Sequence, residues 1–397
     1  MLDPGLCVDP GNHKRNRRIH FPWNPAVDRQ PLLSCRSTSP FAFESIIPSQ
    51  PIFITLPQPH HLPDLNHYRN LTYHQPPKMS TKPLTAAEKT AEFEKVLGRD
   101  RHGNFKEIEA SRPAFDPSGK FTYVQTPQPN WTLGSGANQL ASSPEQEGAK
   151  GEKKQIAIDP YAPGRPAAFN YKLVISAIVP RPLALLSTRS LNADGTTANE
   201  NLAPFSYFNV IAHDPPLFAL GLVTPVAPAS RAKDSMRILH ETGECVINIM
   251  SSPFIEAANA CSVNSPAGLS EWVISGLTPV YDTQTVKAPR AKEACFAVEC
   301  KLVHVKEFES RSNPGETNTT LVVVEGTRFW VDEAAINEER SVMNLDVYRP
   351  LARMAGITYA VVREGFELQR PDFERDVGGL EGYERMKREQ EEKRGRK

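Results

Sequence analysis

Short apolar runs separated by turn signals occupy the middle of the chain. Clusters such as Asn192-Ala-Asp-Gly195 interrupt these runs, and only two segments between them have a convincing helical pattern. We therefore predict a mainly β domain, a barrel with inserted helices. The predicted strands cover residues 173–179, 183–188, 217–223, 245–249, 295–305 and 320–331.

The two inserted helices are predicted over residues 234–242 and 253–261. Asp234 is the expected N-cap of the first helix, because its side chain can accept from the free backbone N–H groups of the first turn. Gly243 follows the last periodic residue and is the expected stop signal.

The first 78 residues differ from the rest of the chain. They hold more than a third of the 36 prolines and more than half of the ten histidines, and their apolar residues have no period that forms a buried face. We predict a largely disordered extension. Met79 begins a stretch of different character, so an alternative is that translation starts there. An intact mass of the native protein that begins at residue 1 or 2 would exclude this alternative.

Changes in composition set the remaining boundaries. Residues 79–157 are predicted to hold a short helix, where Thr85 and Glu88 have capping-box spacing, followed by a linker rich in Pro, Ser and charges. The folded domain is expected over residues 158–373. Residues 374–397 are dense in Glu, Lys and Arg and are predicted to form a solvated helical tail.

The overall composition argues against several classes of protein. The formal net charge is zero and 39% of the residues are apolar, which argues against a strongly basic nucleic-acid binder. No uninterrupted apolar run approaches the roughly 20 residues that span a bilayer. We expect no nucleic-acid partner, no membrane insertion and a cytoplasmic location. A mitochondrial presequence around Arg15 is the alternative, although Asp3, Asp9 and many prolines interrupt any amphipathic helix there.

The six cysteines show no CxxC pair and no metal-ligand spacing. Four of them, Cys245 and Cys295 included, lie in apolar contexts. We interpret them as small buried or idle thiols of a reducing compartment, and we expect no metal site.

Three patches combine residue types that suit binding. In the first, Val179-Pro-Arg-Pro182 leads into a buried strand that ends in the hydroxyls of Ser187 and Thr188. Alone, this pattern indicates only the start of a strand. The glycine-rich stretch at 134–136 is not a dinucleotide loop, because it lacks a third glycine and follows no predicted strand.

The second patch runs from Asn201 to Asn209 and is followed by His213-Asp-Pro-Pro216. Polar and aromatic residues alternate there around prolines that keep the backbone extended. A planar heterocycle needs donors and acceptors in its plane and apolar cover on its faces, and this patch can supply both. The alternative is an aromatic strand pair that closes the barrel.

The third patch, Ser230-Arg-Ala-Lys-Asp-Ser-Met-Arg237, places Arg231 and Lys233 before the helix predicted at 234. Helix starts with free amides attract phosphate, and both cations add full positive charges. Taken singly, this patch is better explained as a solvated helix end.

Together, the three patches carry a resemblance to the flavin reductase-like family. The order Pro180-Arg-Pro182, Ser187-Thr188, Asp194-Gly195, Asn201-Leu-Ala-Pro-Phe-Ser206, Asp214-Pro-Pro216 and Lys233-Asp-Ser235 is similar to that family, as are the closing segments Arg353-Met-Ala-Gly356-Ile-Thr-Tyr359 and Arg370-Pro371. The resemblance covers residues 161–371. Ser235 stands where the family commonly has Thr, and Ala355 stands where a second glycine is often found.

The resemblance implies a split β-barrel that binds FMN, usually as a homodimer with each flavin near the subunit interface. It places residues 201–206 along the isoalloxazine, with backbone amides near its polar edge. It places Ser187 and Thr188 on the ribityl-phosphate side, and Arg231, Lys233 and Ser235 at the phosphate. The expected cofactor-binding residues are Arg181, Ser187, Thr188, Asn201, Leu202, Ala203, Pro204, Phe205, Ser206, Phe208, Asn209, Arg231, Lys233, Asp234 and Ser235.

The implied activity is NAD(P)H-dependent reduction of the bound flavin, with onward transfer to free flavin, an acceptor protein or a small substrate. The flavin carries this chemistry, so no catalytic acid or base is expected, and a structural hydrogen bond is the favoured role of His213. The alternative is an FMN-binding electron-transfer or flavin-storage module without nicotinamide turnover. A role of the N-terminal extension as an interaction arm is compatible with both and rests only on its proline and histidine content.

Overall fold

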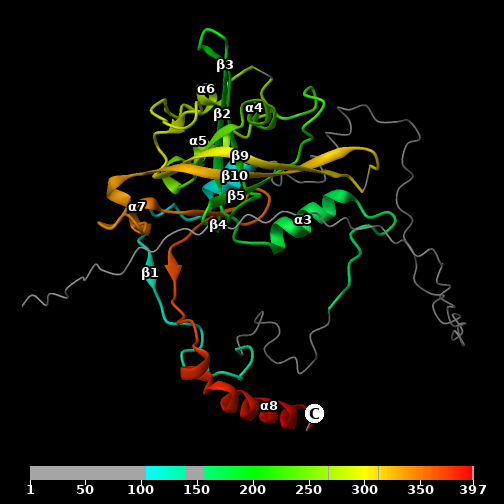
Figure 1. Ribbon diagram of the computed structural model, residues 1–397, viewed down its shortest axis with the longest axis vertical. Coiled ribbons are helices and arrows are strands. Elements are labelled where there is room, and N and C mark those ends of the chain that lie inside the picture. Colours follow the sequence, from blue (N-terminus) through cyan, green and yellow to red (C-terminus); the bar gives the residue numbers. More distant parts are fainter. Residues whose placement is uncertain (1–103, 139–154, 267, 312, 396–397) are drawn as a thin grey trace, which may run out of the picture. The chain divides into compact units, whose positions relative to one another are not determined.

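A seven-stranded antiparallel sheet forms the centre of the protein (Figure 1). The computed structural model describes residues 104–138, 155–266, 268–311 and 313–395. The strand order across the sheet is β3-β2-β6-β9-β10-β5-β4. The strands are β2 (Ala184–Leu191), β3 (Thr197–Phe205), β4 (Phe208–His213), β5 (Pro216–Leu222), β6 (Glu244–Ile249), β9 (Phe296–Glu309) and β10 (Thr317–Val331).

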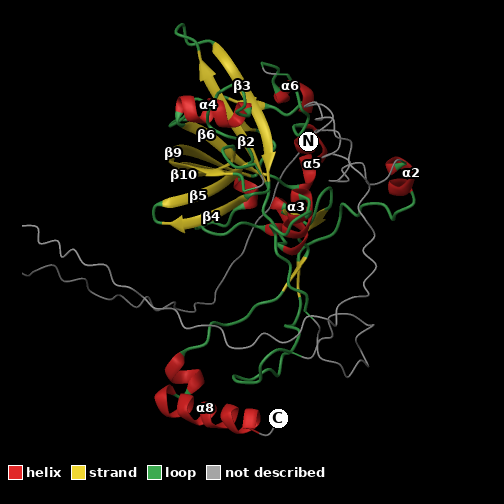
Figure 2. Cartoon of the chain, turned by 90° about the vertical axis from the view of Figure 1, so that its right-hand side faces the viewer, coloured by secondary structure: helices red, strands yellow, loops and turns green. Residues whose placement is uncertain are grey.

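The connection between the two edge strands requires this sheet to curl. In a flat sheet, six strand spacings would separate β3 from β4 by about 29 Å. Only Ser206 and Tyr207 join these two strands, and the three residue steps involved reach about 10 Å. The edges must therefore meet at one end, and the strands fan around a common interior (Figure 2). Among the described residues no ladder pairs β3 with β4, so the predicted split β-barrel is confirmed.

Five of the six predicted strands are present, as β2, β5, β6, β9 and β10, and β3 and β4 are added to them. The strand predicted over 173–179 is wrong, because this segment belongs to the helix α3 (Ala167–Ala177). Ala168 and Ile175, two turns apart, are buried, whereas Leu173 and Val174 are exposed. A short apolar run does not by itself distinguish a buried strand from a helix that buries one stripe.

Strand β2 lies between two apolar clusters, because successive side chains of a strand point to opposite faces. Leu186 packs in the barrel interior with residues of α4 (Asp234–Thr242), while Leu185 packs in the outer cluster with Phe254 and Trp272. The outer cluster is covered by η2 (Ser252–Phe254), α5 (Ile255–Ala260) and α6 (Glu271–Ser275). The helices predicted at 234–242 and 253–261 are thus confirmed.

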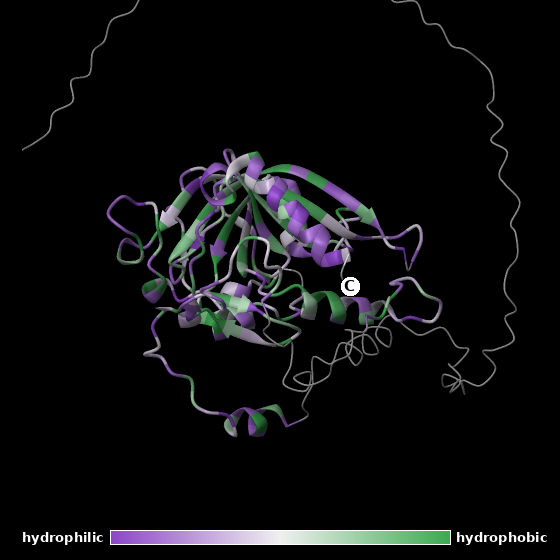
Figure 3. Ribbon diagram, turned by 90° about the horizontal axis from the view of Figure 1, so that it is seen from below, coloured by the Kyte–Doolittle hydropathy of each residue, from purple (hydrophilic) through white to green (hydrophobic). Residues whose placement is uncertain are grey.

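The segments that flank the barrel contact each other. Strand β1 (Thr122–Tyr123) pairs in parallel with β13 (Glu364–Gly365), and Gln390 donates to the carbonyl of Gly134 at 2.6 Å. Gln390 belongs to α8 (Gly379–Gly395), a mostly hydrophilic helix that lies within the tail predicted over 374–397 (Figure 3). The remaining elements are α2 (Phe105–Ala110), β7 (Pro279–Val280), β8 (Arg290–Ala291), η3 (Glu333–Ala335), α7 (Leu345–Tyr348), β11 (Leu351–Arg353), β12 (Tyr359–Val361) and η4 (Phe373–Val377).

Two predictions concern segments beyond the described ranges. The extension over residues 1–78 and the helix after Thr85 lie outside the described residues. In the part of the chain that the structure describes, no helix has the length and apolar character needed to cross a membrane.

Candidate functional site

Residues from the three sequence patches meet where α4 begins. The side-chain amide of Asn201 lies 2.7 Å from the hydroxyl of Ser235 in the first turn of α4. Thr188 is the ladder partner of Asn201, so the two side chains lie on the same face of the sheet. This face carries α4, whose Met236 and Leu239 pack in the same interior cluster as Leu186. The fold thereby brings together residues that lie far apart in the sequence.

The N-cap of α4 differs from the prediction by one residue. Lys233, with extended backbone, is the N-cap, and Asp234 is the first helical residue. The Asp234 carboxylate accepts from Arg237 at 2.6 Å instead of capping the helix, and among the described residues no other side chain caps it. The N–H groups of this first turn consequently lack a side-chain acceptor, which is typical of helix ends that bind anions.

A buried threonine fixes the chain before the helix. The hydroxyl of Thr224 accepts from the Lys233 N–H at 2.9 Å, and the Thr224 carbonyl accepts from the Thr320 hydroxyl at 2.6 Å. Both threonines are almost fully buried. The backbone that presents Arg231 and Lys233 is therefore tied to β10 through Thr224.

Two buried hydroxyls on β2 have no hydrogen-bond partner among the described residues, those of Ser187 and Thr188. Consecutive strand residues point to opposite faces, so only Thr188 faces α4. Ser187 lies across from Leu202 and Val246 on the other face. The two hydroxyls therefore cannot hold one group together, and Thr188 is the one that joins the α4 cluster.

The approach to α4 carries positive charge. The Arg231 guanidinium lies 3.9 Å from the Glu316 carboxylate, and both side chains are about half exposed. A pair of this kind is weak in water, so Arg231 retains much of its capacity to attract an anion. Asp234 is neutralised locally by Arg237 at 2.6 Å.

The corner between β3 and β4 contributes less free surface than the resemblance implies. Phe205 packs against the interior cluster, and Phe208 stacks on Phe218 with ring centroids 6.2 Å apart. The Asn209 side chain accepts from the Val210 N–H at 2.9 Å. These aromatic rings thus serve the barrel core.

The backbone N–H groups of residues 201–206 are also mostly engaged. Leu202 donates away from β2, to Glu271 at 3.2 Å, so antiparallel alternation directs the N–H groups of residues 201, 203 and 205 toward β2. Pro204 has no N–H. Within residues 201–206, only Ser206 has a backbone N–H that points away from β2 and has no acceptor among the described residues. Of the amides expected to contact the polar edge of the isoalloxazine, one is therefore left.

Arg181 lies at the end of α3. Its guanidinium donates to the carbonyls of Ile175 and, at 2.9 Å, Ile178, and its backbone forms a bridge with Arg353. Burial lowers the pKa of Arg181. Its described contacts therefore seat α3 on the barrel, and none of them reaches the α4 cluster.

Two cavities can be compared with the site, one at the α4 cluster and one away from it. A cavity of about 10 Å³ at the α4 cluster has room for about one water molecule. It is lined by Asn199, Glu200, Asn201, Asp234, Arg237, Ile238, Gly268 and Leu269. Burial raises the pKa of Glu200, against the effects of the Tyr281 hydroxyl and Arg189.

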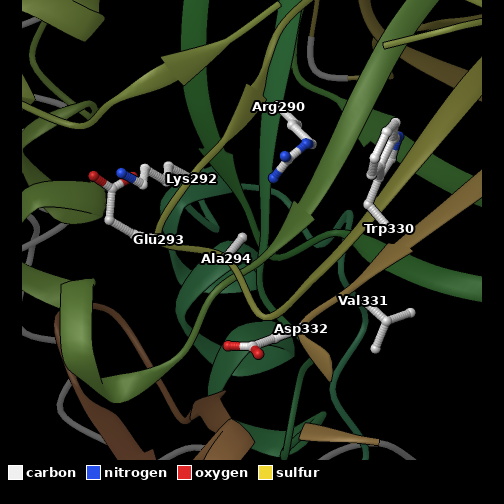
Figure 4. Close-up of a pocket in the computed structure, with 7 residues that line it drawn as sticks. All are labelled: Arg290, Lys292, Glu293, Ala294, Trp330, Val331 and Asp332. Atoms are coloured by element: carbon white, nitrogen blue, oxygen red, sulfur yellow. The ribbon is translucent and has the colours of Figure 1, made fainter. Parts of the chain in front are cut away.

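A depression of about 220 Å³ lies beside β8 and β10 and contains none of the predicted residues (Figure 4). Arg290 stacks over Trp330 there at 4.7 Å and pairs with Asp282 at 2.7 Å. The charge of Arg290, the main cation of this depression, is thus already neutralised by Asp282. The full lining is Arg290, Lys292, Glu293, Ala294, Trp330, Val331 and Asp332.

Sequence reasoning missed three residues that shape this site. Thr224 and Thr320 fix the approach to α4, and Glu271 contacts Leu202 beside Asn201. Thr224 follows a predicted strand and precedes a proline, which is a weak signal for a turn; Glu271 has no signal at all. His213, at the end of β4, is exposed.

Known proteins match about half of the chain. The model of the "Flavin reductase like domain" family matches residues 176–352. The uncharacterized protein YwrF of Bacillus subtilis is 33% identical over 201 residues, which cover 51% of this chain and 93% of that protein. An uncharacterized protein of Halalkalibacterium halodurans is 31% identical over 202 residues, covering 51% and 91% of the two chains.

Solved structures also resemble about half of the chain. Nitrilotriacetate monooxygenase component B from Bacillus cereus has 29% identity and a TM-score of 0.48, and the match covers 55% of this chain and all of that one. The 2-nitrobenzoate 2-nitroreductase NbaA of Pseudomonas fluorescens has 26% identity and a TM-score of 0.45, covering 55% and 98%.

Proposed function

Because the chain belongs to the flavin reductase-like family, we propose that it is an FMN-dependent oxidoreductase. In this proposal NAD(P)H reduces the bound flavin, which passes its electrons to free flavin, an acceptor protein or a small substrate. One observation carries the choice of cofactor: the Thr188 hydroxyl is buried, has no partner among the described residues and faces the start of α4.

The phosphate of FMN suits this position because it accepts hydrogen bonds and carries negative charge. The first-turn N–H groups of α4 and the Thr188 hydroxyl supply donors, and Arg231 and Lys233 supply positive charge. A terminal phosphate fits a helix start flanked by two cations better than the internal phosphates of FAD, because its additional negative charge is met there.

The isoalloxazine would lie along residues 203–206, toward the corner that joins β3 to β4. Ala203 and Pro204 are half-buried there, and Ser206 offers its outward N–H. Neither of the two cavities described above encloses a ring at these residues. We propose that a second copy covers it, because Val210 and Ile211 on the adjacent edge strand β4 are 59% and 54% exposed.

The bound flavin would supply the redox chemistry by accepting a hydride at its N5. The residues of the chain bind and orient the cofactor: Thr188, Arg231 and Lys233 fix the phosphate end, while β3 aligns the ring. Neither an acid nor a base of the chain is required for hydride transfer, so we assign none.

The second candidate function is an FMN-binding electron carrier or storage module. The observation that favours it is the cavity at α4, which is too small to hold a nicotinamide. The cytoplasmic location remains a prediction from the sequence.

An anaerobic spectrum of the FMN-loaded protein distinguishes these candidates. We expect NADH or NADPH to bleach the flavin absorption near about 450 nm, because the cofactor loses this band on reduction. Bound FMN that does not bleach with either nucleotide would support the carrier. A protein that does not bind FMN would remove both candidates.

A further inference from the structure

Glu271 is a buried carboxylate beside the proposed cofactor site. Glu271 is the first residue of α6 and is only 4% exposed. One carboxylate oxygen accepts from the Ser265 hydroxyl, and the other accepts from the Leu202 N–H at 3.2 Å. The second oxygen also lies 3.1 Å from the side-chain amide of Asn201.

These contacts fix the direction of the hydrogen bonds around Asn201. The amide orientation that satisfies all the neighbouring groups has the nitrogen of Asn201 facing Glu271 and donating to its carboxylate oxygen. The amide oxygen then accepts from the Leu202 N–H at 3.2 Å and from the Ser235 hydroxyl at 2.7 Å. The opposite orientation would place two acceptors against each other at Glu271 and two donors against each other at Leu202.

This direction changes the role of Ser235. A serine hydroxyl has one proton, and Ser235 donates it to Asn201. No proton remains for a phosphate, which needs donors. Ser235 is therefore a link between β3 and α4, and the expected phosphate contact of its hydroxyl falls to Thr188.

We propose that Glu271 is a positioning residue that acts through Asn201 and Ser235 to hold the start of α4 beside Thr188. This inference rests on the proposed FMN site. All three residues of the relay are at most 7% exposed, so water cannot replace a lost link easily. The relay spans α6, β3 and α4, and it ends in the helical turn whose N–H groups face the phosphate.

If Glu271, Asn201 and Ser235 act as this relay, breaking it should weaken binding of the FMN phosphate and leave binding of the flavin ring unchanged. A displaced α4 start misplaces the phosphate donors, whereas contacts with the ring along residues 203–206 do not depend on it. The preference for FMN over riboflavin, which has the same ring without the phosphate, is therefore the quantity to measure.

The experiment compares the dissociation constants of FMN and riboflavin for the full chain and its variants. We expect Glu271→Ala to weaken FMN about tenfold more than riboflavin, the size of one charge-assisted contact. Glu271→Gln keeps an acceptor oxygen for Leu202 and Asn201 and should retain the preference within about twofold. Glu271→Asp keeps a carboxylate, but its shorter side chain places that carboxylate farther from Asn201. This variant should therefore lose part of the preference for FMN.

A double variant separates the relay from a direct phosphate contact of Ser235. In a relay, Ser235→Ala combined with Glu271→Ala reduces the preference no further than either change alone. Glu299→Gln is the matched control, because Glu299 is equally buried and hydrogen-bonded but lies on β9. It should leave the preference unchanged.

Two outcomes would overturn the inference: equal loss of FMN and riboflavin in the Glu271 variants, or additive effects of the Glu271 and Ser235 changes. If Glu271→Ala does not fold, the contrast between Glu271→Asp and Glu271→Gln decides, and equal preferences in these two contradict the relay. A wild-type protein that binds both flavins equally would refute the phosphate site itself, which is a separate result.

Discussion

Two buried polar side chains of the same sheet have opposite surroundings. The Glu299 carboxylate on β9 accepts from the N–H groups of Gln284 and Thr285 at 3.0 and 2.6 Å, from the Thr285 hydroxyl at 2.5 Å and from the Trp330 indole at 2.6 Å. The Thr188 hydroxyl on β2 is equally buried, and it neither donates nor accepts a hydrogen bond among the described residues.

Glu299 is thus a structural group with all its partners in the chain, whereas Thr188 is unpartnered and also faces the proposed site. Asn248 resembles Glu299, since it donates to the Leu185 carbonyl at 3.0 Å and accepts from the Ala291 N–H at 2.8 Å. A buried polar group without a partner costs about 1–3 kcal/mol of stability. At Thr188, a bound phosphate would remove that cost. The hydroxyl would therefore lower the stability of the flavin-free protein and raise its affinity for the phosphate.

The largest effect is expected at the satisfied carboxylate. Glu299→Ala leaves four donors without an acceptor and should lower the free energy of unfolding by about 3–5 kcal/mol. Urea unfolding in the absence of flavin measures this change. The FMN affinity of the folded fraction should remain that of the wild type. A loss of less than about 1 kcal/mol would contradict the structural role of Glu299.

The next effect concerns the cations before α4. Replacing both Arg231 and Lys233 by Ala should weaken FMN by roughly 3 kcal/mol, about two decades in affinity, because two charge-assisted contacts are lost. Riboflavin should be affected little, and fluorescence titration measures both ligands. Lys292→Ala, in the depression beside β8, is the control and should change neither affinity. Equal losses for FMN and riboflavin would exclude this phosphate position.

A smaller effect of opposite sign is expected at Thr188. Thr188→Val removes the unpartnered hydroxyl at nearly constant volume, so it should raise the free energy of unfolding by about 1 kcal/mol while weakening FMN about tenfold. Urea unfolding and FMN titration of the same preparation test the two signs together.

Ser187→Ala is the control for Thr188, because Ser187 is equally buried but faces away from α4. It should also stabilise the protein, and its FMN affinity should stay at the wild-type value. A comparable loss of FMN affinity in Ser187→Ala would show that the two faces of β2 are not separated as described.

The smallest effect is a dependence of stability on pH. Burial raises the pKa of Glu299, but the hydrogen bonds from Thr285, Gln284 and Trp330 outweigh it, and the net pKa is lowered. The stabilisation by Glu299 is therefore complete above the unfolded pKa of about 4.3 and is lost as the pH falls through the lower folded value. Glu299→Gln should flatten the acid side of the stability curve, as measured by unfolding at a series of pH values.

The sequence predicted the barrel better than the details of its edge. Strands β2, β5, β6, β9 and β10 carry apolar runs because they are buried, and that signal is local. Strand β3 mixes polar and apolar residues, since its side chains meet α4 on one face and α6 on the other. The run at 173–179 is apolar without being a strand, because α3 leaves Leu173 and Val174 exposed.

Three residues that the motifs indicated lie together in the structure, and their role in cofactor binding stays a prediction. The motifs indicated Thr188, Asn201 and Ser235, and the structure brings them together at α4. The hydrogen-bond direction among them depends on Glu271, which lies far along the chain and has no local pattern. Likewise, the separation of Ser187 from Thr188 follows from the pleat of β2 and the helix that packs on it.

The most direct test of the proposed cofactor site is a titration of the wild-type protein with FMN and with riboflavin under identical conditions. If α4, Thr188 and the two cations hold the phosphate, FMN should bind about 100-fold more tightly than riboflavin, the value expected for two charge-assisted contacts. Equal affinities for the two flavins would contradict this account.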